Sequence, residues 1–164
     1  AAPWSARTLG IDGTTREYFV REPTQPPRAI VLLLHGNGGS ARALASTERP
    51  HALHAWHAIA EREALRLVIP EGAAGSEGRQ GWNDCRADAD NNPTTDDVRF
   101  LTRLAAAEQP RGRRVPVFVA GTSNGGQMAL RLAIKQPRAG RGVAAVVAAM
   151  AASSECRETR RAVN

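Results

Sequence analysis

Four runs of mostly aliphatic residues, separated by segments with helical periodicity, dominate the hydrophobic pattern of this chain. The runs are Ala29–Leu34, Leu67–Ile69, Val115–Ala120 and Val143–Met150. Continuous apolar runs of this length are typical of strands that are buried on both faces of a parallel sheet. The pattern therefore predicts an α/β fold with a doubly wound, mostly parallel sheet.

The segments between these runs predict helices. We expect one helix over Ala52–Ala64, a second over Val98–Glu108 and a third over Gly126–Gln136. The sequence Thr95-Asp96-Asp97 places capping and negatively charged side chains at the start of the second helix, where they are favoured. Pro137 ends the third helix because proline cannot continue the hydrogen-bond ladder.

The N-terminal segment predicts a β-hairpin. Ser5–Ile11 and Thr15–Arg21 alternate in polarity and flank Asp12-Gly13, a dipeptide that tight hairpin turns prefer because both positions take positive φ. Pro23–Pro27 then forms a short connector. No change in composition divides the rest of the chain, so we expect a single domain over residues 1–164.

The third aliphatic run leads into a pattern that indicates a catalytic serine. Gly121-Thr122-Ser123-Asn124-Gly125 lies between Val115–Ala120 and the expected helix, the strand–turn–helix context of a nucleophile elbow. Glycines on both flanks relieve the crowding that so tight a turn creates. We therefore predict Ser123 as a nucleophile, the alternative being a buried serine that caps the helix.

A glycine-rich loop, His35–Gly39, follows the first aliphatic run. In an open α/β sheet the carboxyl ends of the strands meet at one edge, where ligands bind. The loop therefore lies near Ser123, and the backbone amide of Asn37, or alternatively of Gly38, joins that of Asn124 as an oxyanion hole. An ordinary strand-to-helix turn is the alternative.

Two segments contain residues that often bind metals, but neither has the spacing that a metal site needs. His51, His54 and His57 are three residues apart, so the first and third diverge around a helix and cannot hold one ion together with the second. Asp88–Asn92 resembles the start of a calcium loop, but Pro93 stands at the position that requires glycine. We expect no metal.

Phosphate-binding patterns fail as well. Gly121–Gly126 has the spacing of a P-loop, but Gln127 replaces the lysine that the loop requires. The His35–Gly39 loop lacks the third glycine of a dinucleotide fingerprint. We expect no cofactor.

The charge of the chain does not indicate a nucleic-acid partner. The formal net charge is +6, and it comes almost wholly from arginine because Lys135 is the only lysine. The arginines are mostly scattered, and aromatic residues do not alternate with them as a stacking surface needs. Because no apolar stretch reaches the 18 or so residues of a membrane span, we expect no membrane partner either.

The two cysteines, Cys85 and Cys156, permit one disulfide. Both lie in loops that follow strands toward the edge that carries Ser123. A disulfide between them and two free thiols both remain open.

Five motifs together resemble the polyhydroxybutyrate depolymerase-like esterases of the α/β-hydrolase fold, a group that includes feruloyl esterases. The resemblance extends from about Ala29 to Ala151. In chain order, the motifs are His35-Gly36-Asn37-Gly38-Gly39, Val68-Ile69-Pro70-Glu71-Gly72, Gly81-Trp82-Asn83-Asp84-Cys85, Asp96-Asp97-Val98-Arg99-Phe100-Leu101 and Gly121-Thr122-Ser123-Asn124-Gly125-Gly126.

The resemblance implies a secreted or periplasmic serine esterase without a metal or cofactor. It implies an acyl-enzyme on Ser123, with polyhydroxyalkanoate-type, short-chain or aromatic feruloyl-like esters as substrates. The amides of Asn37 and Asn124 would form the oxyanion hole. The residues that it places at the substrate are Gly38, Trp82 and Asp84.

The resemblance leaves the catalytic acid and base unassigned. In this family an Asp and then a His follow the nucleophile on two further strands, and no histidine follows Ser123 in this sequence. An apolar strand over Val143–Met150 at the edge of a sheet would also need a partner to cover it. We therefore expect the N-terminal part of a hydrolase.

The remaining strands, Asp and His would come from a separate C-terminal polypeptide, for example after cleavage near Glu155–Asn164. A truncated chain is the alternative. A serine without a base is a poor nucleophile, so a non-catalytic binding or structural protein, or an inactive fragment, is the alternative function.

Overall fold

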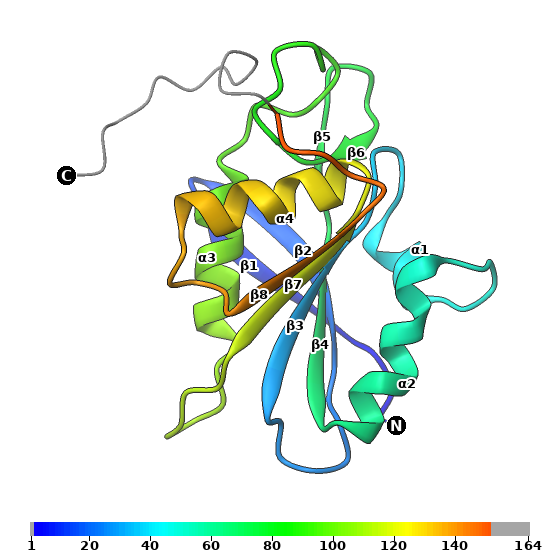
Figure 1. Ribbon diagram of the computed structural model, residues 1–164, viewed down its shortest axis with the longest axis vertical. Coiled ribbons are helices and arrows are strands. Elements are labelled where there is room, and N and C mark those ends of the chain that lie inside the picture. The colour runs from blue at the N-terminus through cyan, green and yellow to red at the C-terminus, as the bar shows by residue number, and fades with distance from the viewer. Residues whose placement is uncertain (1, 152–164) are drawn as a thin grey trace.

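The structure, a computed structural model, describes residues 2–151. Within this range six strands form one sheet in the order β1-β2-β4-β3-β7-β8 (Figure 1). Its strands are β1 (Ser5–Ile11), β2 (Thr14–Arg21), β3 (Ala29–Leu34), β4 (Leu65–Pro70), β7 (Val117–Thr122) and β8 (Gly142–Val146). Strands β4, β3, β7 and β8 are parallel, and the β1–β2 hairpin adds antiparallel to β4.

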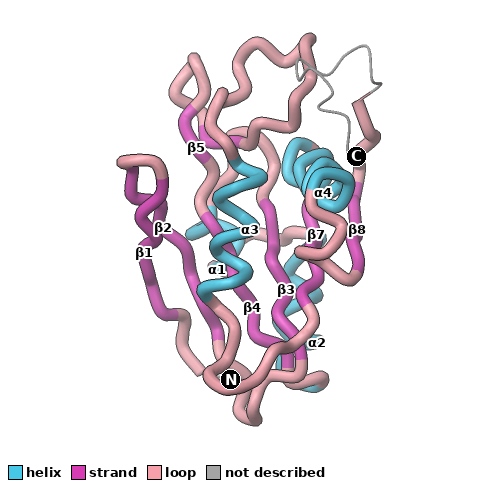
Figure 2. The backbone as a smooth tube through the Cα atoms, turned by 90° about the vertical axis from the view of Figure 1, so that its left-hand side faces the viewer, coloured by secondary structure: helices cyan, strands magenta, loops and turns pink. Residues whose placement is uncertain are grey.

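Helices cover both faces of this sheet, as the two views in Figures 1 and 2 show. The helices of one face are α1 (Ala41–Ala45), η1 (Ala52–His54) and α2 (Ala55–Arg62). The opposite face carries α3 (Asp97–Ala107) and α4 (Asn124–Lys135). A second, two-stranded sheet, β5 (Ala73–Ala74) with β6 (Gln80–Gly81), lies in the loops beyond the carboxyl ends of β3 and β4. This is the α/β-hydrolase arrangement expected from the sequence.

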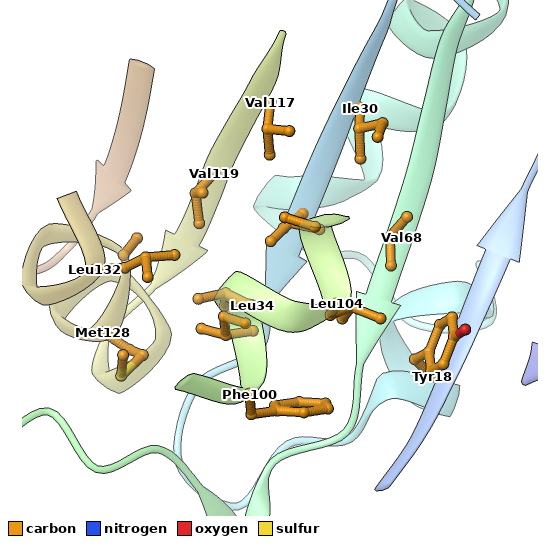
Figure 3. Packing of buried hydrophobic residues seen from close by; sticks show 14 of the residues in the cluster. Tyr18, Ile30, Leu34, Val68, Phe100, Leu104, Val117, Val119, Met128 and Leu132 are labelled. Carbon is orange, nitrogen blue, oxygen red and sulfur yellow. The ribbon is translucent and has the colours of Figure 1, made fainter. Parts of the chain in front are cut away.

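The burial of the β3 side chains explains why Ala29–Leu34 is an uninterrupted aliphatic run. All six residues of β3 are buried, with alternate side chains on opposite faces. Val31 and Leu33 pack toward α1 and α2, whereas Leu32 and Leu34 pack toward α3 and α4. On the second face, Phe100, Leu104, Met128 and Leu132 close the core (Figure 3).

The helices differ from the prediction at several boundaries, since α3 is Asp97–Ala107 and α4, which starts two residues earlier than expected, is Asn124–Lys135. The segment expected as one helix over Ala52–Ala64 begins as a 3₁₀ turn, because the His51 side chain accepts a hydrogen bond from the Leu53 amide (3.1 Å). The short helix α1 was not predicted. It begins at Ser40, whose hydroxyl accepts a hydrogen bond from the Ala43 amide (3.1 Å).

Three of the parallel strands also differ. Strand β4 covers Leu65–Pro70 where Leu67–Ile69 was expected. We expected a strand over Val115–Ala120, but β7 begins at Val117 and continues to Thr122, where it still pairs with β8. The strand expected over Val143–Met150 was too long: β8 ends at Val146, since Val147 takes a positive φ of 51°.

Strand β8 lies at one edge of the described sheet and is only half-buried. Its neighbour β7 exposes 36% of Phe118 on the face opposite α4, and Val147 and Met150 are 89% and 60% exposed. The expectation that the apolar segment Val143–Met150 needs a further partner to cover it stays a prediction.

Candidate active site

Ser123 stands on a sharp turn between β7 and α4. Its backbone has φ 50° and ψ −125°, a conformation that a residue with a side chain adopts only when its surroundings impose it. The Ser123 amide donates to the Val146 carbonyl, and the Gln127 amide donates to the Ser123 carbonyl, each over 2.9 Å. The residue is exposed, and its hydroxyl has no hydrogen-bond partner among residues 2–151.

The glycines around Ser123 are required by close packing. A Cβ on Gly121 would overlap the Gly125 carbonyl and lie 2.7 Å from the Gly126 nitrogen. A Cβ on Gly125 would lie 2.7 Å from the carbonyl carbon of Leu34. Because these neighbours are backbone atoms, they cannot move aside as a flexible side chain would. The geometry is that of a nucleophile elbow.

The glycine-rich loop passes next to the nucleophile, since a Cβ on Gly36 would lie 3.5 Å from that of Ser123. The amide of Gly38 already donates to the Gln80 carbonyl (2.8 Å). In the described part of the chain, the amides of Asn37 and Asn124 have no such acceptor. This difference favours Asn37 over Gly38 as the second donor toward an oxyanion near Ser123.

The side chain of Asn124 turns away from this opening and into the loop after β6. Its Nδ2 donates to the Trp82 carbonyl (3.0 Å) and to Asp84 Oδ2 (2.7 Å). Its Oδ1 accepts a hydrogen bond from the Trp82 amide (2.8 Å). The side-chain amide is therefore fully bonded, which leaves the backbone N–H for a ligand.

Two of the three residues expected at the substrate are buried. Trp82 is completely buried, and its Nε1 donates to the His35 carbonyl (2.8 Å). Asp84 is 3% exposed and accepts hydrogen bonds from Asn124, Arg86 and Asn92. Of the three, only Gly38 is exposed. Asp84 also lines a groove of about 200 Å³ together with Arg86 and Asn92. The expectation that Trp82 and Asp84 meet a substrate stays a prediction.

His35 connects the glycine-rich loop to the loop after β4. Its Nδ1 lies 2.8 Å from the Gly36 carbonyl, and its Nε2 lies 3.0 Å from the Gly72 amide and 2.9 Å from Glu71 Oε1. The Gly72 amide also lies 3.2 Å from Glu71 Oε1, so the His35 ring, Glu71 and this amide form one cluster. Both nitrogens are occupied, so His35 is not placed to take a proton from Ser123.

The other three histidines lie side by side along η1 and α2. The ring centroids of His51 and His54 are 5.6 Å apart, and those of His54 and His57 are 5.2 Å apart. Burial, followed by the neighbouring His54, lowers the pKa of both His51 and His57. Over residues 2–151, no group of three or more His, Cys, Asp or Glu side chains is arranged to hold a metal ion.

A groove of about 350 Å³ opens beside the elbow and the glycine-rich loop. Thr122, the residue before Ser123, forms part of its wall. Other residues of the wall are His35, Gly36, Asn37, Arg49 and His51. A larger groove of about 760 Å³ lies at the opposite end of β7, between α3 and the loop after α4, away from this chemistry.

Cys85 takes part in a disulfide. Its expected partner, Cys156, and the Glu155–Asn164 segment lie outside the described residues. Among the described helices, none has the length and apolar character needed to cross a membrane.

The sequence matches the model of one protein family, described as phospholipase/carboxylesterase, over residues 15–164. It is also 35% identical over 154 residues to NocK of Nocardia uniformis subsp. tsuyamanensis, whose name assigns it to the esterases. The match covers 88% of this chain and 41% of NocK, so the chain spans less than half of that relative.

Solved structures with the same fold include an S-formylglutathione hydrolase from Agrobacterium tumefaciens, with a TM-score of 0.63 and 15% identity. The match covers 87% of this chain and 56% of the hydrolase. A carboxyl esterase from Bacillus coagulans has a TM-score of 0.58 at 15% identity, over 88% of this chain and 44% of the esterase. At these identities the likeness shows the fold alone.

Proposed function

The chain belongs to the phospholipase/carboxylesterase family, and on this premise we propose that it carries the nucleophile and the oxyanion hole of a serine carboxylic ester hydrolase. The observation that carries the proposal is the exposed Ser123 on its strained turn, next to the unpaired backbone N–H groups of Asn37 and Asn124. A structural serine needs neither the strain nor the two open donors.

The reaction proceeds through an acyl-enzyme. Ser123 Oγ attacks the ester carbonyl carbon while a base takes the hydroxyl proton, and the carbonyl oxygen becomes an oxyanion. The amides of Asn37 and Asn124 donate to that oxyanion, and removal of one such donor typically costs about 3–4 kcal/mol. The alcohol leaves with the proton, and water then attacks the acyl group and releases the acid and Ser123.

The base and its acid partner come from a further C-terminal segment of the same hydrolase. No histidine among the described residues hydrogen-bonds to Ser123, and both nitrogens of His35 have other partners. The half-buried edge strand β8 offers a place where further strands would add to the sheet. Relatives that extend well beyond this chain are consistent with that assembly.

The groove of about 350 Å³ beside Ser123 is the part of the substrate site that this chain contributes. We propose esters of the polyhydroxyalkanoate, short-chain or feruloyl-like aromatic type, as in the depolymerase-like esterases that the motifs resemble. A secreted or periplasmic location fits the disulfide at Cys85, because such bonds persist in oxidising compartments.

Among residues 2–151 no histidine is bonded to Ser123, which favours one competing function, a non-catalytic binding or structural protein that keeps the elbow. A fluorophosphonate reagent, which forms a covalent bond only with an activated serine, separates the two. We expect the natural full-length protein to gain one phosphonyl group on Ser123, located by peptide mass spectrometry, and the Ser123→Ala variant to gain none. An unlabelled Ser123 in the wild-type protein would leave the non-catalytic function.

A further inference from the structure

We propose that Asp84 is a positioning residue that fixes the spacing of the two oxyanion donors, Asn37 and Asn124. It has no contact with the reacting atoms and acts through the side chains of the residues that supply the amides. The inference rests on the proposed function, because it assigns a role within the same oxyanion hole.

Asp84 is buried and accepts hydrogen bonds from several surrounding residues. The side chain is 3% exposed, and both of its oxygens accept hydrogen bonds. Oδ2 accepts from Asn124 Nδ2 (2.7 Å) and Arg86 Nε (3.1 Å), and Oδ1 accepts from the Arg86 amide (3.2 Å) and Asn92 Nδ2 (3.0 Å). A buried carboxylate with four donors is held in one position, since each donor would be left unpaired if it moved.

Two of these donors lead to the oxyanion hole. Two chains of hydrogen bonds, here called arms, run from Asp84 to Asn124 and Asn37. The first arm is a direct bond from Asn124 Nδ2 to Asp84 Oδ2. The other passes through Asn92, whose Oδ1 accepts a hydrogen bond from Asn37 Nδ2 (3.3 Å) while its Nδ2 donates to Asp84. The two residues with open backbone amides, 87 positions apart (124 − 37), are thus tied to one carboxylate.

Gly81 brings the two arms close together. A Cβ at this position would lie 3.0 Å from Asn124 Oδ1 and 3.0 Å from Asn37 Nδ2, so both side chains pass the same glycine. The absence of a side chain at Gly81, in β6, therefore lets the side chains of Asn37 and Asn124 approach each other. A change in Asp84 should reach both residues through their hydrogen bonds.

The negative charge of Asp84 matters because all its partners are donors. An Asn at position 84 keeps the shape, but its NH₂ group would face two donors and lose those bonds. The expected result is a displaced Asn37 or Asn124 amide, and displacement of a catalytic group by about 1 Å can cost about 100-fold in rate.

The test compares Asp84→Asn with the wild type in the natural full-length protein, with p-nitrophenyl acetate as substrate and active sites counted by titration. We expect kcat to fall about 100-fold while KM changes little, because the oxyanion forms only after binding. Affinity for a trifluoromethyl ketone, which forms an oxyanion adduct with the serine, should fall in the same proportion. A purely structural role would lower thermal stability and leave both quantities unchanged per active site.

Asp97→Asn is the matched control. Asp97 is a fully buried carboxylate that bonds Arg16 (2.8 Å) and the Asn83 amide (2.8 Å) but has no bond to Asn124 or Asn92. We expect it to lower thermal stability while kcat per active site stays at the wild-type value.

Asn92→Ala decides the question if Asp84→Asn fails to fold, because it removes only the arm to Asn37. We expect a smaller loss in kcat, roughly 5- to 10-fold, again with little change in KM. A folded Asp84→Asn with wild-type kcat and inhibitor affinity would overturn the proposal, as would wild-type values for Asn92→Ala where Asp84→Asn does not fold. Activity that survives Ser123→Ala would instead overturn the proposed function.

Discussion

The carboxyl edge of the sheet and its β8 edge are built in opposite ways. Around the elbow, Trp82 is fully buried and Asn124 and Asp84 are 2% and 3% exposed, and their polar groups are bonded to one another. Along the β8 edge, Phe118 and Val147 are 36% and 89% exposed, and β8 pairs with a strand on one side alone in the described sheet.

This contrast separates the groups that the described chain holds in place, the proposed nucleophile and oxyanion donors, from the base that it does not supply. The proposed nucleophile and oxyanion donors lie in a network of buried hydrogen bonds, the kind of arrangement that electrostatic preorganisation requires. In the described sheet β8 has a neighbouring strand on one side only, and the backbone groups of such an edge can pair with another strand. A base that arrives on such a strand would therefore meet a site whose other half is already in place.

Replacement of Gly125 by alanine should break the rigid side of this contrast most severely. The added Cβ would collide with the carbonyl groups of Leu34 and His35, which are backbone atoms that cannot yield. We expect a loss of about 3 kcal/mol or more in the free energy of unfolding, measured by urea denaturation, together with loss of fluorophosphonate labelling.

Gly10→Ala is the control for this substitution. Gly10 lies in β1, and a Cβ there meets no atom within 4 Å. Its cost should stay within about 0.5 kcal/mol. Equal losses for the two variants would mean that close packing does not shape the elbow.

Alkaline pH should weaken the fold at a position far from the elbow. Burial, with a hydrogen bond to Glu108 (2.8 Å) and the charge of that carboxylate, raises the pKa of Tyr18 to about 12. The unfolded chain loses this proton near pH 10, so between pH 10 and 12 the folded state holds more protons and stability falls as the pH rises. We expect a loss of about 2 kcal/mol over this window.

Tyr18→Phe checks that assignment. It should cost about 1 kcal/mol at pH 8 through the lost hydrogen bond, and the decline in unfolding free energy above pH 10 should become shallower. A wild-type and a variant curve that stay parallel from pH 8 to 12 would show that Tyr18 is not the group that titrates.

The smallest effect is expected at the open edge. Phe118 is partly exposed whereas Val119, the next residue in β7, is 2% exposed. In the 164-residue chain Phe118→Ala should cost no more than about 1 kcal/mol, and Val119→Ala about 2 kcal/mol, by denaturant unfolding. The reverse order would mean that this face of β7 is already covered.

Much of the fold could be predicted because its signals are local. The six buried residues of β3 and the Asp12-Gly13 hairpin turn stand as the pattern indicated. The end of β8 could not be found this way, since Val147 is as apolar as its neighbours and only its positive φ stops the strand. Helix α1 was missed because five residues carry too little periodicity.

The residues of the candidate site also divide into those with a local sequence signal and those that depend on contacts in the folded chain. Ser123, Asn37 and Asn124 could be named as candidates from short motifs whose flanks fix their geometry. The positioning role that we propose for Asp84 could not, because it depends on contacts with Asn92 and with Asn124, 40 residues away in the sequence. Motif resemblance predicts Asp84 at the substrate, and the structure adds that its side chain is buried and bonded to Asn124 and Asn92. Asn92 gave no signal beyond its place in a polar loop.

The central claim, that Ser123 is the nucleophile of an ester hydrolase, is tested most directly by the turnover of a p-nitrophenyl ester. In the natural full-length protein, Ser123→Ala should lower kcat by about 10⁴-fold or more while the folded structure remains intact. Hydrolysis at a rate close to that of the wild type would contradict the account.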